Sequence, residues 1–208
     1  MKKLTLSLFL LAFSLPALAA KPAAPATLKL DTQVSKAVWT GKKISGSHTG
    51  FVLFKEGSFQ MKNGAPASGR VVVDMTSVTC EDLKNDPESK AKLEKHLKGP
   101  DFFNIEKYPT AEFKMKSFEE MQTFAPGGPN AIARGDLTVR GVTHPAEVRF
   151  VYTPNDIGFT AKGKLQIDRT AHGVKYNSKK FYDMKALGDK LIEDQFEVEL
   201  DLSAKGKT

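Results

Sequence analysis

The chain has 208 residues, and its 31 Lys and Arg against 24 Asp and Glu give a formal net charge of +7. A hydrophobic fraction of 40% and a charged fraction of 26% exclude wholesale disorder and fit one domain, or two small ones at most. The single cysteine, Cys80, excludes an internal disulfide framework and any cysteine-rich zinc or iron–sulfur site.

The first 19 residues have the pattern of a Sec-type signal peptide. Two lysines precede a mostly apolar stretch at 4–15, and Ala17-Leu18-Ala19 places small residues where signal peptidase cuts. We expect cleavage between Ala19 and Ala20 and a periplasmic, secreted protein. A retained membrane anchor is the alternative, but the apolar run is short for a spanning helix and Pro16 interrupts it.

Residues 20–29 are rich in Ala and Pro and lack periodicity, so we expect a flexible leader there and one domain over 30–203. The dominant period in that domain is two, which is typical of strands with one dry and one wet face. It is clearest at 110–116, 147–152, 158–168 and 192–202. The apolar faces of these stretches carry Ala111, Phe113 and Met115; Val148, Phe150 and Tyr152; Phe159, Ala161, Gly163, Leu165 and Ile167; and Ile192, Phe196, Val198, Leu200 and Leu202, with Asp194 as the one polar exception.

Weaker strand patterns lie at 34–44, 50–61, 69–77 and 131–140, which brings the total to about eight. A closed barrel buries one face of such strands and hides their edges, so we predict an all-β fold with an antiparallel barrel of about eight strands. A two-sheet sandwich is the alternative.

One helix interrupts the strands. Asp86 is a good N-cap, Pro87 suits the first helical position, and Gly99-Pro100 stops the helix after Leu97. Its narrow apolar stripe indicates that it docks on the barrel. A second helical turn is indicated at 178–185.

The interior of the barrel can be interpreted in two ways. The chain has 14 Phe but one Trp and four Tyr, so its dry faces carry few polar groups. Such faces suit a cavity for an apolar guest, and they equally suit a packed, Phe-rich core. Composition leaves both open.

Motifs for catalysis and for nucleotide cofactors are missing from the sequence. It has no G-x-S-x-G, no H-E-x-x-H and no glycine-rich phosphate loop, and its four His stand far apart. We therefore expect no enzyme, no cofactor and no metal. Two local groups remain. Phe102 and Phe103 either lock the helix onto the barrel or line a cavity mouth, and Asp168 and Arg169 either hold a turn or contact a ligand headgroup.

Several segments together resemble the YceI-like family of exported, lipocalin-like lipid-binding proteins. They cover roughly 30–202 and include Ser35-Lys36-Ala37-Val38-Trp39-Thr40-Gly41, Gly46-Ser47-His48-Thr49-Gly50-Phe51, Asp101-Phe102-Phe103, Tyr108-Pro109-Thr110-Ala111-Glu112-Phe113, Gly135-Asp136-Leu137-Thr138-Val139-Arg140-Gly141-Val142-Thr143 and Ile167-Asp168-Arg169. The resemblance implies an extended, lipocalin-like antiparallel barrel of eight strands with one helix packed against it. It also implies an apolar tunnel for a polyisoprenoid, an isoprenoid quinone or a similar long amphiphile. His172 departs from the family pattern, in which an aromatic residue is usual.

We therefore expect a carrier or storage protein whose bound partner is a long-chain isoprenoid amphiphile. A transient contact with a membrane surface and a homodimer are left open, and the modest charge surplus is no nucleic-acid signature. An enzyme acting on a small amphiphile through converging His residues, or a barrel without ligand, is the alternative. Asp168, Arg169 and His172 are the candidate headgroup contacts. The candidate tunnel residues are Trp39, Phe51, Phe102, Phe103, Phe113, Met115, Phe150, Tyr152, Phe159, Leu165, Phe196 and Val198.

Overall fold

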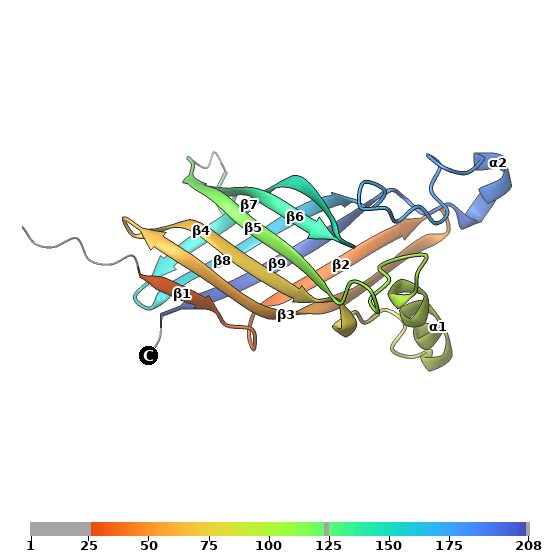
Figure 1. The fold of residues 1–208 in the computed structure, drawn as a ribbon, viewed down its shortest axis with the longest axis horizontal. Coiled ribbons are helices and arrows are strands. Elements are labelled where there is room, and N and C mark those ends of the chain that lie inside the picture. The colour runs from red at the N-terminus through yellow and green to blue at the C-terminus, as the bar shows by residue number, and fades with distance from the viewer. Residues whose placement is uncertain (1–25, 123–124, 207–208) are drawn as a thin grey trace, which may run out of the picture.

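The computed structural model describes residues 26–122 and 125–206, so the expected signal peptide lies outside the described residues. Nine antiparallel strands in this part of the chain form one sheet (Figure 1). They are β1 (Thr27–Leu30), β2 (Lys36–Lys43), β3 (Gly46–Lys62), β4 (Ala65–Asp74), β5 (Thr110–Glu120), β6 (Ala131–Val139), β7 (Val142–Asn155), β8 (Gly158–Asp168) and β9 (Gln195–Lys205).

The sheet closes on itself because β3 pairs with β2 on one side and with β4 on the other. Strands β2 to β9 thus form the predicted eight-stranded antiparallel barrel. Strand β1 is an addition that pairs with β3 and β9, the same two neighbours that β2 has. The expectation of a flexible leader is wrong at 27–29, since Leu28 and Leu30 are buried in β1. Four residues are too few for a period of two to stand out in the sequence.

The faces of the four clearest strands lie as their periodicity predicted. Ala111 and Met115 of β5, Val148 and Phe150 of β7, and Ala161 of β8 are buried, whereas Lys114, Arg149 and Thr160 on the opposite faces of these strands are exposed. The inner faces of eight strands together enclose the centre of the molecule.

Shifts in strand register change which residues face inward. The pairing of β3 with β4 shifts between Phe54 and Glu56 and again between Gln60 and Met61, and the pairing of β5 with β6 shifts between Met115 and Ser117. A bulge adds one residue to a strand and so reverses the alternation beyond it. Phe54 and Phe59 therefore both face inward although their spacing is odd, and so do Met115 and Phe118.

Both helices lie at one end of the barrel, here called the helical end (Figure 1). Helix α1 (Pro87–Lys98) begins as predicted, since the Asp86 side chain accepts a hydrogen bond from the Ser89 amide, and it ends at Gly99. Helix α2 (Met184–Leu187) overlaps the expected helical turn but begins later. Short 3₁₀ helices lie at Met75–Ser77 and Gly188–Lys190.

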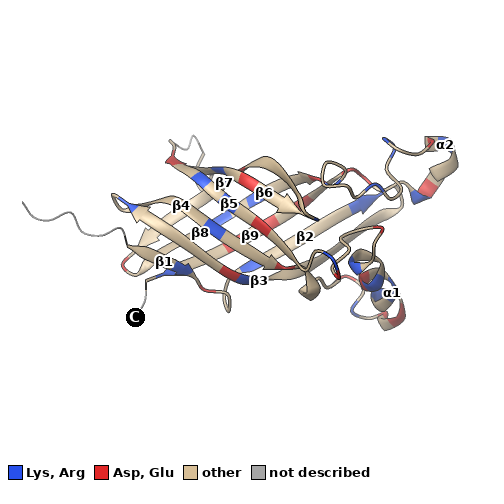
Figure 2. Cartoon of the chain, in the orientation of Figure 1, with Lys and Arg blue, Asp and Glu red and all other residues tan. Residues whose placement is uncertain are grey.

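Charged residues of opposite sign lie on neighbouring strands along the outer face of the barrel (Figure 2). Arg70 of β4 pairs with Glu112 of β5, and Arg134 of β6 pairs with Glu147 of β7. Exposed pairs of this kind contribute little to stability, about 0–1 kcal/mol each, so the interior decides the fold.

Candidate ligand-binding cavity

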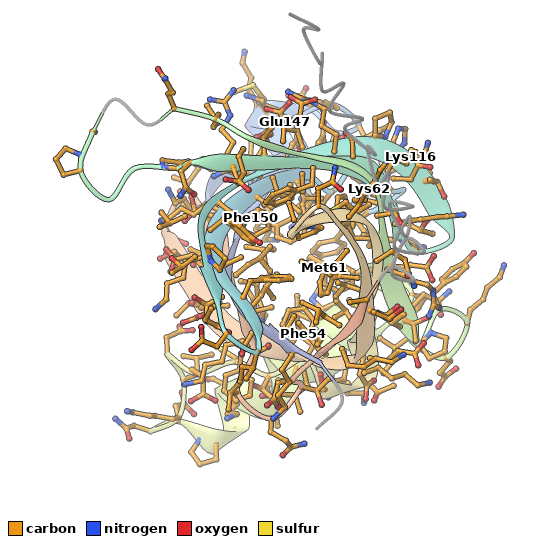
Figure 3. The ribbon with its side chains drawn as sticks, turned by 90° about the vertical axis from the view of Figure 1, so that its left-hand side faces the viewer. Phe54, Met61, Lys62, Lys116, Glu147 and Phe150 are labelled. Atoms are coloured by element: carbon orange, nitrogen blue, oxygen red, sulfur yellow. The ribbon has the colours of Figure 1, made fainter. Side chains whose placement is uncertain are left out.

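A cavity of about 220 Å³ runs inside the barrel and is lined by residues from all of the strands β2 to β9. In the view along the barrel, Phe54, Met61 and Phe150 point inward, whereas Lys116 and Glu147 point away (Figure 3). A void of roughly 10–15 Å³ already holds one water molecule, so this cavity is far larger than a packing defect. The structure therefore favours a cavity over a fully packed core.

The lining is almost entirely apolar. Among the described lining residues, the charged ones are Glu112, Arg169 and Glu193, and there is no Ser, Thr, Cys, His, Lys or Tyr. The Glu112 carboxylate pairs with Arg70, and the Arg169 side chain is committed to backbone carbonyls. A polar ligand would lose its hydrogen bonds to water in this cavity without gaining new ones, so the wall disfavours polar ligands and suits an apolar chain.

Aromatic rings pack against one another at the helical end of the barrel. His96 of α1 packs edge-on against Phe102 and Tyr176, with ring centroids 4.9 and 4.6 Å away. Phe103 packs against Phe196 of β9 at 6.4 Å. Phe102 and Phe103 thus both dock the helix region onto the barrel and line the cavity, so the two readings of this pair hold together.

Two arginines tie the loops at this end together. Arg140 donates hydrogen bonds to the carbonyls of Pro100, Phe102 and Gly173. Arg169, only 4% exposed, donates to four more carbonyls, those of Val174, Tyr176, Ile192 and Glu193. Burial of so many carbonyls is tolerated because each one accepts a hydrogen bond.

Most of the expected tunnel residues line the cavity, with two exceptions. Those on the wall are Trp39, Phe102, Phe103, Phe113, Met115, Phe150, Phe159, Leu165, Phe196 and Val198. Phe51 is not on it, because Val52 and Phe54 take the inward positions of β3 and Phe51 faces out, half-buried. Tyr152 is buried but packs between Phe118 and Phe159 beyond the cavity wall.

The expected headgroup residues do not converge on the cavity. Asp168 is held by Thr170 and Lys180; burial acts to raise its pKa, but hydrogen bonds from Lys180 and Thr170 outweigh burial and lower the pKa to about 2. The His172 ring is buried and lies against the Val142 carbonyl, and burial lowers its pKa. Of the three, Arg169 alone reaches the wall, and four of its five N–H groups already donate to backbone carbonyls. Both Asp168 and Arg169 make the contacts expected of the turn-holding alternative.

Sequence reasoning missed three aromatic residues of the wall, Phe54, Phe59 and Phe118. All three lie on strands that carry a bulge, where a strict period of two fails. It also missed how Trp39 is oriented: the indole Nε1 donates a 3.0 Å hydrogen bond to the Thr79 carbonyl.

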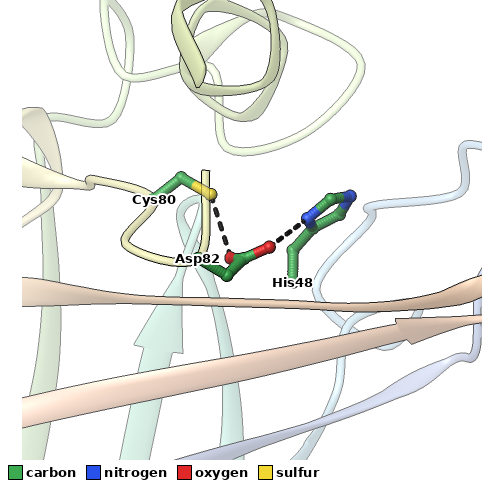
Figure 4. Close-up of side chains that lie close together, drawn as sticks. All are labelled: His48, Cys80 and Asp82. Atoms are coloured by element: carbon green, nitrogen blue, oxygen red, sulfur yellow. Dashed lines mark hydrogen bonds and ion pairs between the residues drawn. The ribbon is translucent and has the colours of Figure 1, made fainter. Parts of the chain in front are cut away.

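A small polar cluster lies outside the barrel between β3 and the segment before α1 (Figure 4). His48 Nδ1 is 2.8 Å from one oxygen of Asp82, and the buried Cys80 thiol donates to the other at 3.2 Å. Burial, together with this hydrogen bond, raises the thiol pKa to about 11. The ligand atoms of His48, Cys80 and Asp82 are close enough together to bind a cation. The thiol would first have to lose its proton, however, and the positive charges of Lys43 and Lys92 in the adjoining hollow disfavour a cation. The hydrogen bond between His48 and Asp82 thus links the segment before α1 to β3.

The His residues do not assemble into one site. His48 pairs with Asp82, whereas His144 packs edge-on against His172 with ring centroids 5.2 Å apart. No His is among the described lining residues of the cavity. The convergence that an enzyme of small amphiphiles would need is therefore not formed around the cavity.

The comparisons with known proteins give a family and a fold. A family model described as a YceI-like domain matches residues 28–204. Protein YceI of Escherichia coli O157:H7 is 31% identical over 118 residues, 53% of this chain and 54% of that protein. A UPF0312 protein of Vibrio parahaemolyticus is 31% identical over 137 residues, 58% of this chain and 66% of that protein. The matched region spans about half the length of the first curated relatives.

Two solved structures share the barrel. BcnA of Burkholderia cenocepacia has a TM-score of 0.57 at 19% identity, covering 83% of this chain and 98% of that one. A polyisoprenoid binding domain from Saccharophagus degradans has a TM-score of 0.58 at 12% identity, covering 88% and 99%. At these identities the likeness is one of fold.

Proposed function

Because this chain belongs to the YceI-like family, we propose that its barrel binds a long isoprenoid amphiphile, a polyisoprenoid or an isoprenoid quinone, with the apolar tail inside the cavity. The observation that carries the proposal is the almost entirely apolar wall of that cavity. Burial of apolar surface contributes about 25 cal/mol per Å², so a long chain binds without any polar contact. The solved polyisoprenoid binding domain of the same fold supports the choice of ligand.

A binding protein fits the cavity better than an enzyme does. Apart from Glu112 and Glu193, the described lining residues offer no nucleophile or general base. The carboxylate of Glu112 is already paired with Arg70. Transport, storage or sequestration of the lipid needs none of these groups.

We place the protein in the periplasm on the strength of its Sec-type leader. Within the described residues, no helix is long and apolar enough to cross a membrane. A carrier in that compartment collects its lipid from a membrane, so a transient contact with a membrane surface belongs to the proposal. The homodimer stays a separate proposal, to be tested by light scattering.

The first test is mass spectrometry of an organic extract of the mature protein, purified from the periplasm without detergent. We expect an isoprenoid lipid or quinone in near-stoichiometric amount. A clean extract from folded protein, which also fails to take up added quinone, would refute the proposal in favour of the ligand-free barrel. The sole tryptophan, Trp39, lies on the cavity wall and reports quinone uptake by quenching of its fluorescence.

A matched pair of variants locates the ligand. Phe113→Asp places a charge on the cavity wall, whereas Lys114→Asp places the same group on the outer face of the same strand. We expect the first variant to lose bound lipid and the second to keep it. Circular dichroism checks that both remain folded, and lipid retained by a folded Phe113→Asp protein would show that the tail lies elsewhere.

A further inference from the structure

A group of large apolar side chains stands exposed on the loop that carries α2. Phe181 is 47% exposed, Tyr182 49% and Met184 62%. Ile44, at the turn between β2 and β3, is 64% exposed and adjoins the end of this loop, since its amide donates to the Leu191 carbonyl. We call these four residues the apolar tip.

The tip projects from the helical end because its supports are fixed. Ser178 is fully buried, and its carbonyl accepts hydrogen bonds from the amides of Phe181 and Tyr182. Arg169 holds both ends of the loop, because it donates hydrogen bonds to the carbonyls of Tyr176 and Ile192. The loop lies at the far end of the molecule, beyond the barrel (Figure 1). Exposure of this apolar surface is thus built into the loop.

The surroundings of the tip are basic. Residues 175–190 contain five lysines against two aspartates, a net charge of +3. All five lysines are exposed, and Lys175 Nζ lies 4.9 Å from the centroid of the Phe181 ring. One of them, Lys180, also pairs with Asp168. The lysines therefore lie beside the apolar side chains of the tip, and Lys175 lies over one face of the Phe181 ring, which remains 47% exposed.

Exposed aromatic and Met side chains ringed by lysines match the interface of an anionic bilayer. Tyr and Phe rings enter the headgroup region, and lysines are attracted to anionic lipids. A second copy of this chain would bring two such basic loops together, and their like charges would repel. Charge complementarity thus selects an anionic lipid surface as the occupant.

We propose that the apolar tip and its flanking lysines form a docking surface for an anionic lipid bilayer. The inference rests on the proposed function, since Val174, Ile192 and Glu193 at the ends of the loop also line the cavity. Docking at the tip sets the helical end of the cavity against the membrane from which the lipid comes.

The test measures co-sedimentation of the mature protein with vesicles of phosphatidylcholine containing about one third phosphatidylglycerol, and with vesicles of phosphatidylcholine alone. The triple variant Phe181→Ser, Tyr182→Ser, Met184→Ser is compared with the control triple Val34→Ser, Leu53→Ser, Ile157→Ser, whose side chains are 56%, 50% and 64% exposed elsewhere on the molecule.

We expect the tip triple to bind the anionic vesicles at least about tenfold more weakly than the wild type, with the control triple unchanged. Lys179→Gln with Lys185→Gln should weaken that binding by about fivefold per lysine, and salt near 1 M should weaken wild-type binding. Absence of wild-type binding, or equal losses in the two triples, would overturn the proposal. A dimer that only the tip triple loses, without vesicle binding, would assign the tip to a second copy.

Bound lipid in each variant is measured by extraction in the same preparation. A tip variant that keeps its lipid but loses vesicle binding supports docking. Wild-type protein that binds vesicles but carries and takes up no isoprenoid would refute the proposed function and leave the docking surface standing.

Discussion

Arg140 donates a 2.8 Å hydrogen bond from Nη1 to the carbonyl of Phe102, 38 residues away in the chain. The same guanidinium reaches the carbonyls of Gly173 and Pro100 at 3.0 and 2.9 Å. One side chain from the turn between β6 and β7 thus joins the loop after α1 to the loop after β8. These two loops carry Phe102, Phe103 and Tyr176, whose rings pack together at the helical end.

Replacing Arg140 tests this connection. Arg140→Met leaves three carbonyls without their charged donor, so we expect the free energy of unfolding to fall by about 1–3 kcal/mol. Arg149→Met is the matched control, because that guanidinium pairs with Glu147 on the exposed outer face and should contribute about 0–1 kcal/mol. Urea denaturation measures both. Equal losses would show that the loops are held by packing alone.

Filling the cavity should displace the ligand. Ala161 lies on the cavity wall, whereas Thr160 before it is exposed on the outer face. We expect Ala161→Phe to take up cavity volume and reduce bound lipid severalfold, and Thr160→Phe to leave it unchanged. Quantitative extraction of folded protein is the measurement. If the two variants carried the same amount of lipid, the ligand would not occupy this part of the barrel.

Gly50 allows the close approach that orients Trp39. A Cβ at Gly50 would lie 1.8 Å from the Thr79 carbonyl oxygen, the atom that accepts the indole hydrogen bond. Gly50→Ala should therefore cost about 1–3 kcal/mol or more and shift Trp39 fluorescence. A Cβ at Gly41 would have nothing within 4 Å, so the free energy of unfolding of Gly41→Ala should stay within about 0.5 kcal/mol of the wild-type value. Thermal melts and emission spectra separate the two, and a tolerated Gly50→Ala would show that the Thr79 segment moves freely.

The Cys80 thiol should be unreactive in the native protein. Burial and its hydrogen bond to Asp82 raise its pKa from 9.0 to about 11, so at pH 8 it is almost wholly protonated. We expect a disulfide reagent to react slowly with native protein and rapidly in urea. Fast native labelling would contradict the buried position.

The same pKa shift makes stability depend on pH. The folded state holds the thiol proton more tightly than the unfolded chain does, so this contribution is complete below pH 9 and is lost as the pH rises toward 11. Cys80→Ser should flatten that part of the alkaline stability profile. Urea midpoints measured from pH 8 to 11 check it, and identical profiles for the two proteins would refute it.

The amino-acid sequence by itself determined the architecture. Strict alternation at residues such as Ala111, Phe113 and Met115 fixes which side of a strand is dry, and Asp86 with Pro87 starts the helix. Both signals are local, because a side chain's face depends only on its neighbours along the strand or turn. The strand pattern favoured a barrel and left a two-sheet sandwich as the alternative, and the pairing of β3 with both β2 and β4 shows the closure.

Only the tertiary structure decided the wall in detail. Bulges reverse the alternation in β3 and β5, so Phe59 and Phe118 face the cavity, while Phe51 faces outward by the register of β3. Arg169 turned out to clamp loop carbonyls, because its partners lie up to 24 residues away and only folding brings them into reach. Register, bulges and long-range hydrogen bonds arise between segments distant in the chain, and no local period records them.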